Sequence, residues 1–156
     1  MTSWIRLAAP AALVSTILPP AYAVQYLSIA QAQKEAFPSA TSFAQVDVRS
    51  WKAQSGAMVL GLFVIDHVIG KHLYIDYAVA LAPGGRVQRV EILAYRESYG
   101  GEIRSPSWLA QFVGKTSGSA LKVGSDIRNI SGATLSCTHV TEGVKRIVAA
   151  YGSRVR

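Results

Sequence analysis

The chain has 156 residues, of which half are hydrophobic and 16% are charged, and its formal charge is +7. This length accommodates one domain with a substantial core, and the composition is that of a packed globular protein rather than a disordered chain. The cations are scattered, without the dense basic run typical of nucleic-acid binding, so we expect no nucleic acid partner. Cys137 is the only cysteine, which excludes an internal disulfide, an iron–sulfur cluster and a c-type haem attachment.

Residues 1–23 have the pattern of a secretory signal peptide. A single cation, Arg6, is followed by an apolar stretch over residues 7–18, by two prolines, and by a short run ending at Ala23 that fits an A-x-A cleavage site. The alternative is an uncleaved membrane anchor, but a spanning helix needs roughly 20 apolar residues. We therefore predict cleavage near Ala23, a mature domain over residues 24–156 with a charge of +6, and a soluble, periplasmic or otherwise exported location.

The first element of the mature chain is predicted to be a short helix. Ser28 and Gln31 have the spacing of a capping box, and Phe37-Pro38 places the end of the helix near Ala36. Residues 39–56 have no clear period, and we expect a strand there only near residues 46–48.

From residue 57 to residue 95 the pattern is that of β structure. A buried, strand-like run reads "AMVLGLFVIDHV" and is followed by "LYIDYAVAL", whose alternation puts Leu73, Ile75, Tyr77, Val79 and Leu81 on one face. The turn "APGGR" and the run "VQRVEILAY" complete an antiparallel hairpin over residues 73–95.

Two further helices are predicted after the hairpin. Ser105-Pro106 begins the first, which carries an apolar stripe from Trp108 to Val113 and ends at Gly114. Residues 116–126 form a loop, and the last helix presents apolar residues at helical spacing from Val140 to Tyr151. The order of elements predicts an α+β domain in which an antiparallel β-sheet packs against a few helices.

Four small residues, Ser131-Gly132-Ala133-Thr134, stand just before the last predicted helix. The first N–H groups of a helix lack partners within it, and the helix dipole favours a phosphate at that point. Gly132 and Ala133 leave room for a large group close to the backbone. The alternative is structural, with a serine or threonine as the N-cap and small residues that allow tight packing.

This run, with the flanking residues Ile130, Leu135 and Ser136, resembles the flavinylation motif of the FMN-binding domain family. Members of that family include the domains of the sodium-pumping quinone reductase and of Rnf-type complexes that carry covalent FMN. Two other segments agree with the family: "ILAYRESYGGEI", which holds Glu97 and Gly100, and "WLAQFVGK". The resemblance covers about residues 57–150 and implies an FMN-binding domain-like fold.

The resemblance also implies a cofactor and a site. In the family the threonine that ends the motif bears FMN through a phosphoester bond, and the matching residue here is Thr134. Residues of the same run surround this point: Ser131, Gly132, Ala133, Leu135 and Ser136. Glu97 and Ser98 are candidates to hydrogen-bond the flavin ring or ribityl chain, and Tyr99 and Trp108 are candidates to pack on it. Each of these four also has a core or turn interpretation.

The function implied by the resemblance is that of an exported electron-transfer flavoprotein domain. A flavin transferase that uses FAD would attach the covalent FMN, and the domain would relay electrons between redox partners, soluble or membrane-bound. We expect an electron carrier rather than a self-contained enzyme. The alternative is a non-flavinylated exported adaptor or sensory module of the same fold. This alternative is considered because Arg128 stands where the family usually has an acidic residue. Asp126 could take the place of that acidic residue if the loop bends.

Other motifs in the sequence give little evidence of function. Gly114-Lys115-Thr116 resembles the end of a phosphate-binding loop, but Leu109 stands where that loop requires a glycine. His67 and His72 flank a predicted turn without a carboxylate or thiolate partner at ligand spacing, so we interpret them as polar turn residues and predict no metal site. His139 is interpreted as a solvated helix residue, and Cys137 as a small buried hydrophobe.

Overall fold

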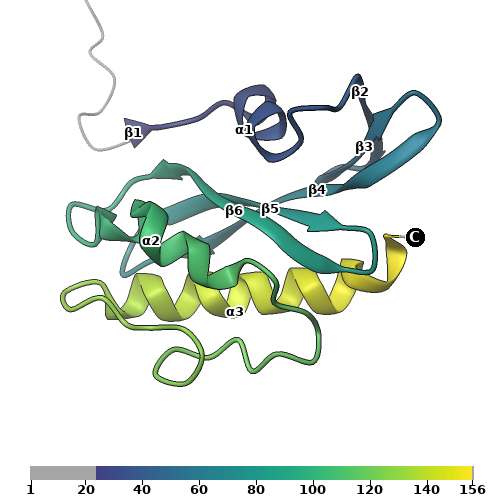
Figure 1. Cartoon of the computed structure of the whole chain (residues 1–156). Coiled ribbons are helices and arrows are strands. Elements are labelled where there is room, and N and C mark those ends of the chain that lie inside the picture. The colour runs from purple at the N-terminus through teal and green to yellow at the C-terminus, as the bar shows by residue number, and fades with distance from the viewer. Residues whose placement is uncertain (1–23, 156) are drawn as a thin grey trace, which may run out of the picture.

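Six strands form one antiparallel sheet in the order β1-β6-β5-β4-β3-β2. The computed structural model describes residues 24–155, so the predicted signal peptide lies outside the described residues. The strands are β1 (Val24–Gln25), β2 (Ser42–Asp47), β3 (Ser50–Ser55), β4 (Met58–Ile69), β5 (Tyr74–Ala82) and β6 (Arg86–Tyr95). Figure 1 shows α1 (Ile29–Ala36) on one face of this sheet and α3 (Thr134–Tyr151) on the other. The expected α+β architecture is confirmed.

The β5–β6 hairpin forms as the alternation predicts. Ile75, Tyr77, Val79 and Leu81 are fully buried on the face that packs against α3, whereas Leu73 precedes the strand and is exposed. The turn between the strands contains Gly84 and Gly85, both at positive φ. Alternation thus identified the buried face but extended it one residue too far.

The helix α1 begins with the predicted capping box. The Ser28 hydroxyl accepts a hydrogen bond from the Gln31 backbone N–H at 3.2 Å, and the Ser28 N–H donates to the Gln31 side-chain oxygen at 2.8 Å. Ala32 and Ala36 face the sheet, where they form a second, smaller core with Phe63 of β4. The sheet is therefore covered on both faces, with the larger core on the α3 side.

The hairpin of β2 and β3 was not predicted in full. The sequence indicated a strand only near residues 46–48, but β2 spans Ser42–Asp47 and β3 follows after a short turn. Most side chains of β2 are exposed, since this strand is the edge of the sheet. An edge strand with so little buried surface has no apolar period to reveal it.

The helix predicted at Ser105-Pro106 is shorter than expected. α2 covers only Pro106–Leu109 and continues as a 3₁₀ turn over Ala110–Phe112. Ser105 occupies the N-cap position, but its side chain makes no capping hydrogen bond. Trp108 and Phe112 are buried, while Val113 at the end of the predicted stripe is exposed.

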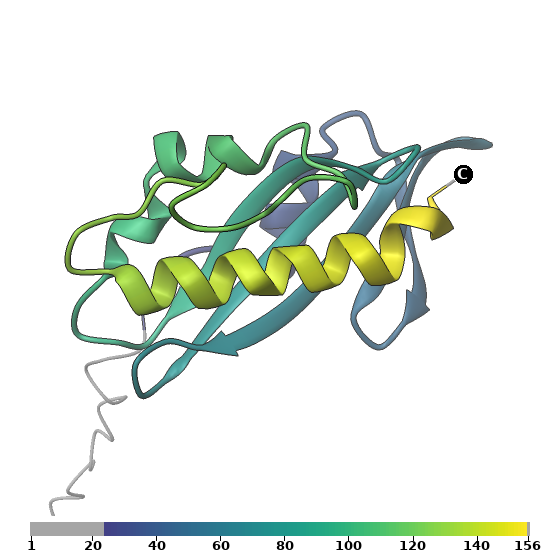
Figure 2. The same ribbon diagram turned by 90° about the horizontal axis from the view of Figure 1, so that it is seen from below.

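The helix α3 crosses the sheet on the face opposite α1, as the view from below shows (Figure 2). Its predicted stripe is buried at Val140, Val144, Ile147 and Val148. Gly143 lies directly against the Tyr77 ring, with no space for a side chain. This contact sets how closely α3 approaches β5. Among the described residues, no helix is long and apolar enough to cross a membrane.

The substitution Gly143→Ala is expected to destabilise the protein. In an exposed helix the change would add about 1 kcal/mol of stability, but here the new Cβ would overlap the Tyr77 ring, and such overpacking costs about 1–3 kcal/mol. Urea unfolding measures the net loss. In a Tyr77→Phe background, which removes the nearest atom, Gly143→Ala should cost less. An equal cost in both backgrounds would contradict this account.

Candidate functional site

The helix α3 starts without a side-chain cap. Ala133 is the N-cap residue and Thr134 the first residue of the helix, so the alternative of a serine or threonine N-cap is wrong. Gly132, at φ +84°, makes the turn into the helix, and the Ala133 N–H donates to the Ile130 carbonyl at 3.0 Å. A Cβ at Gly132 would meet no atom within 4 Å. The glycine therefore supplies a backbone conformation and leaves open space beside it.

The first N–H groups of α3 are free to bind a ligand. The first intrahelical bond runs from the Cys137 N–H to the Ala133 carbonyl at 2.9 Å. The N–H groups of Thr134, Leu135 and Ser136 make no hydrogen bond within residues 24–155. These groups and the helix dipole favour an anion at this end of α3.

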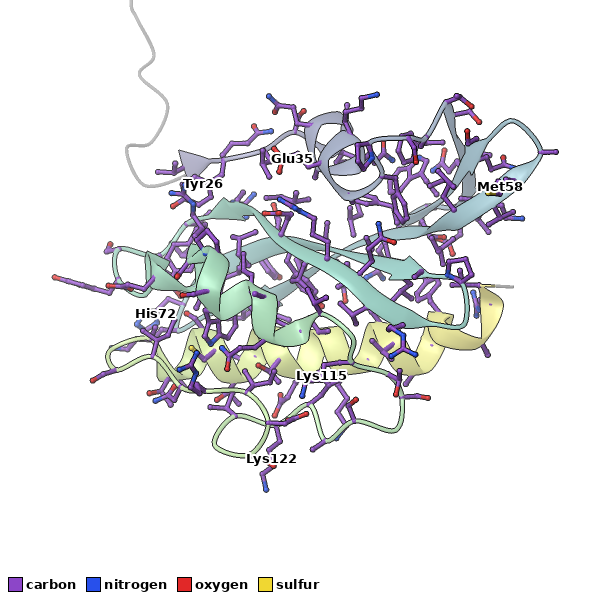
Figure 3. All side chains as sticks on the ribbon, viewed as in Figure 1. Tyr26, Glu35, Met58, His72, Lys115 and Lys122 are labelled. Carbon is purple, nitrogen blue, oxygen red and sulfur yellow. The ribbon has the colours of Figure 1, made fainter. Side chains whose placement is uncertain are left out.

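A cavity of about 480 Å³ opens at this end of α3. The turn between β4 and β5, the segment after β6 and the first turn of α3 form its walls, and Figure 3 labels His72 at this end of the molecule. Its lining comprises Lys71, His72, Glu97, Ser98, Tyr99, Gly132, Ala133, Thr134, Leu135 and Ser136. The structure thus brings together eight of the ten predicted site residues, the exceptions being Ser131 and Trp108.

Glu97 connects two walls of the cavity. Its carboxylate accepts hydrogen bonds from the backbone N–H groups of His72 and, at 2.8 Å, Leu73. Burial acts to raise the pKa of Glu97, but these N–H donors outweigh it and hold the pKa below its ordinary value. A Cβ on Gly70 would lie 2.9 Å from the same carboxylate oxygen, so a larger residue there would displace the Glu97 side chain. Glu97 therefore acts as a structural link at the cavity.

Tyr95 connects two of the segments that line the cavity. Its hydroxyl donates to the Tyr99 carbonyl and lies 3.2 Å from the Ser136 hydroxyl, which joins the segment after β6 to the first turn of α3. Burial raises the pKa of Tyr95, so the phenol is neutral at physiological pH. Gly100, at φ +90°, gives this phenol its space, because a Cβ there would lie 2.6 Å from the Tyr95 hydroxyl oxygen. The Tyr99 side chain itself is 86% exposed.

The Thr134 side chain is exposed, and a hydrogen bond from Asn129 holds its hydroxyl in one orientation. Its hydroxyl oxygen accepts a hydrogen bond of 3.0 Å from the side-chain amide of Asn129. Ser131 is also exposed but does not line the cavity. Sequence reasoning noted Asn129 only as part of a chance glycosylation motif, Asn129-Ile130-Ser131, and did not connect it with Thr134. A separation of five residues does not reveal a contact across the turn.

Trp108 lies outside the cavity. Its ring is buried edge-on against Phe112, and its indole N–H donates to the Arg128 carbonyl at 2.8 Å. The structure thus gives Trp108 the core role that was the alternative to packing on a flavin. The indole supports the loop that leads to α3 rather than the cavity wall.

Asp126 has partners of its own. Its carboxylate accepts from the N–H groups of Leu121 and Lys122, at 3.1 Å and 2.9 Å, and pairs with Lys115 at 3.0 Å. Burial opposes ionisation, but these partners lower the pKa of Asp126 to about 2. Asp126 therefore stabilises the loop before the cavity and does not take the place of the acid that Arg128 replaces.

Lys71 and His72 were not among the predicted site residues. They occupy the turn between β4 and β5, which lines the cavity together with the first turn of α3. His139 is half-buried rather than solvated, and its Nδ1 lies 2.6 Å from the Ile69 carbonyl oxygen, so it fastens this turn to the helix. Within residues 24–155 no group of three or more histidine, cysteine or acidic residues has the arrangement of a metal site.

Cys137 is completely buried beneath the first turn of α3. Burial raises the pKa of its thiol, which keeps it protonated and unreactive. The interpretation of Cys137 as a small hydrophobe is confirmed.

The comparison with protein families identifies this chain. The family model of the FMN-binding domain matches residues 70–149, just over half of the chain. This match covers β5, β6, α2 and most of α3, and contains every predicted site residue. The chain belongs to the FMN-binding domain family, and a flavin-binding role in electron transfer follows from that membership. No curated protein matches it closely enough to add a more specific likeness.

The substitution Glu97→Gln should weaken the fold at neutral pH. Loss of the charged acceptor is expected to lower the free energy of unfolding by about 1 kcal/mol, since Glu97 is only partly buried and solvent screens its charge. A depressed pKa contributes stability that is complete above the ordinary carboxyl pKa, 4.5 here, and is lost as pH falls below it. Urea unfolding should therefore show a difference between wild type and variant at pH 7 that shrinks below pH 4.5. A difference independent of pH would contradict the assignment.

Proposed function

We propose that this protein is an exported electron carrier in which FMN is joined to Thr134 by a phosphoester bond. The observation that carries the proposal is the position of Thr134. Its exposed hydroxyl stands on the wall of the cavity at the first turn of α3, beside three N–H groups that have no hydrogen-bond partner among the described residues. Ligand pockets typically have volumes of about 300–1,000 Å³, and the cavity falls in this range.

The residues at the start of α3 fit a phosphate. Because Ala133 has no capping side chain, no group within residues 24–155 competes for the N–H groups of Thr134, Leu135 and Ser136. Gly132 leaves open space in which a bulky substituent can approach the backbone. A phosphodiester on Thr134 would keep one negative charge, which the helix N-terminus stabilises.

The opposite wall fits the rest of the cofactor. Lys71 supplies a cation, Ser98 an exposed hydroxyl, and Tyr99 a solvent-exposed ring that can cover an aromatic ligand. Glu97 is held by the turn after β4, so in this proposal it shapes the wall and leaves the polar contacts to Ser98 and the main chain. When bound, FMN supplies the electron-accepting and electron-donating chemistry, and the protein positions it and sets its surroundings.

Attachment needs a second enzyme and a flavin donor. In the proposed reaction, Thr134 Oγ1 bonds to the phosphorus of the FMN half of FAD, the pyrophosphate P–O bond breaks, AMP leaves, and the hydroxyl proton passes to the solvent or a transferase base. The domain gains the mass of FMN less one water. A covalent bond prevents loss of the cofactor outside the cell, and the predicted signal peptide over residues 1–23 is the reason to propose export.

The carrier role, rather than that of a self-contained enzyme, fits a domain whose cavity its cofactor would fill. Redox partners, soluble or membrane-bound, are then needed on both sides. A non-flavinylated adaptor of the same fold remains the second candidate, because Arg128 stands where the family usually has an acid and Asp126 is occupied elsewhere.

The decisive measurement is the intact mass of the protein after co-expression with a flavin transferase. Wild type should gain one FMN less one water, Thr134→Ala should gain nothing, and Thr134→Ser should gain the same mass because it retains a hydroxyl. Ser125→Ala, which removes an exposed hydroxyl outside both the motif and the cavity, is the matched control and should be flavinylated normally, and Ser131→Ala tests the neighbouring hydroxyl as the acceptor.

Three results would count against the covalent carrier. If wild type gains no mass while the transferase modifies a control substrate, the adaptor role is preferred. If Thr134→Ala is still modified, the attachment site is wrong. If Ser131→Ala alone loses the added mass, Ser131 is the acceptor.

A further inference from the structure

Three hydroxyl groups lie close to one another at the start of α3, and they differ in how they are held. Ser136 is 5% exposed, and its hydroxyl lies against the Tyr95 phenol. Ser131 is exposed but precedes the helix, and its side chain makes no hydrogen bond within the described residues. Only Thr134 is both exposed and oriented, through the amide of Asn129.

We infer that Asn129 is a positioning residue that orients Thr134 Oγ1 for phosphoester formation and so determines which hydroxyl is modified. This inference rests on the proposed function. The Asn129 amide donates to Thr134 Oγ1 at 3.0 Å and thereby fixes the side-chain rotamer. The hydroxyl keeps its own hydrogen and a second lone pair. It can therefore form a bond to phosphorus with that lone pair while its proton leaves to an external base.

The backbone around Asn129 is anchored on both sides. The Arg128 N–H donates to the Gln111 side chain at 2.8 Å, and the Arg128 carbonyl accepts from the Trp108 indole at 2.8 Å. On the other side, the Ile130 carbonyl accepts from the Ala133 N–H at 3.0 Å, and the Ile130 side chain packs against the core. Asn129 thus extends from a fixed main chain, which lowers the entropy cost of holding Thr134 in one rotamer.

The chemistry of an amide suits this position. The donor of the flavin carries a negatively charged pyrophosphate, and a carboxylate beside Thr134 would repel it. Asparagine is neutral and donates a hydrogen bond to the attacking oxygen, so it orients the hydroxyl without adding negative charge. Asn129 cannot serve as the base, since an amide nitrogen of this kind accepts no proton at neutral pH.

The test is the rate of flavinylation of the purified protein by a flavin transferase with FAD. Asn129→Ala and the isosteric Asn129→Asp should each lower kcat by about five- to tenfold, with KM for the acceptor protein unchanged. Ser125→Ala, an exposed change in the same loop, is the matched control and should keep both constants. Thr134→Ser should increase the dependence on Asn129, because serine lacks the methyl group that restricts χ1.

The outcomes separate this inference from the proposed function. Unchanged kcat in Asn129→Ala, or a change confined to KM, would overturn the positioning role while leaving Thr134 as the attachment site. Normal kcat in Asn129→Asp would show that the donated hydrogen bond is not needed and would also overturn it. If wild type itself gains no flavin from an active transferase, the proposed function fails and the role of Asn129 fails with it. Equal thermal midpoints for all variants would show that a kcat loss does not come from unfolding.

Discussion

The packing of α3 along the sheet is the constraint on which the site depends. Burial of its apolar stripe against β4 and β5 fixes the axis of the helix, and the contact of Gly143 with Tyr77 fixes its distance from the sheet. Because the axis of α3 and its distance from the sheet are fixed, the first turn of the helix is held next to the turn between β4 and β5. The free N–H groups of that turn are thus held by a core that lies largely outside the cavity.

A small set of polar contacts then gives the cavity its shape. Glu97 connects the segment after β6 to the turn after β4, and Tyr95 connects the same segment to the start of α3. Both side chains use their hydrogen-bonding capacity on protein partners, whereas Ser98, Tyr99 and the α3 N–H groups keep theirs available. This division separates residues that build the cavity from residues that can contact a ligand within it.

The sequence predicted local features well and long-range contacts poorly. The capping box of α1, the β5–β6 hairpin and the stripe of α3 depend on neighbouring residues, and each is confirmed. The motif ending at Thr134 identified one wall of the cavity, and the family resemblance identified a second. Lys71, His72 and Asn129 could not be found this way, because their positions follow from strand pairing and loop anchoring rather than from any pattern around them. For Trp108 the sequence left a core role and a flavin contact open, and the structure shows the core role, with the indole N–H donating to the Arg128 carbonyl.

The cavity is built from three segments that are far apart in the chain, around residues 71, 98 and 134. These segments meet only when β4, β6 and α3 are all in place, so the unfolded chain has no such cavity. Any molecule held there non-covalently is thermodynamically linked to global folding: occupancy stabilises the whole domain, and a defect in the distant α3–β5 contact weakens occupancy without touching the molecule that is bound. Binding in the cavity and folding of the domain are therefore coupled equilibria.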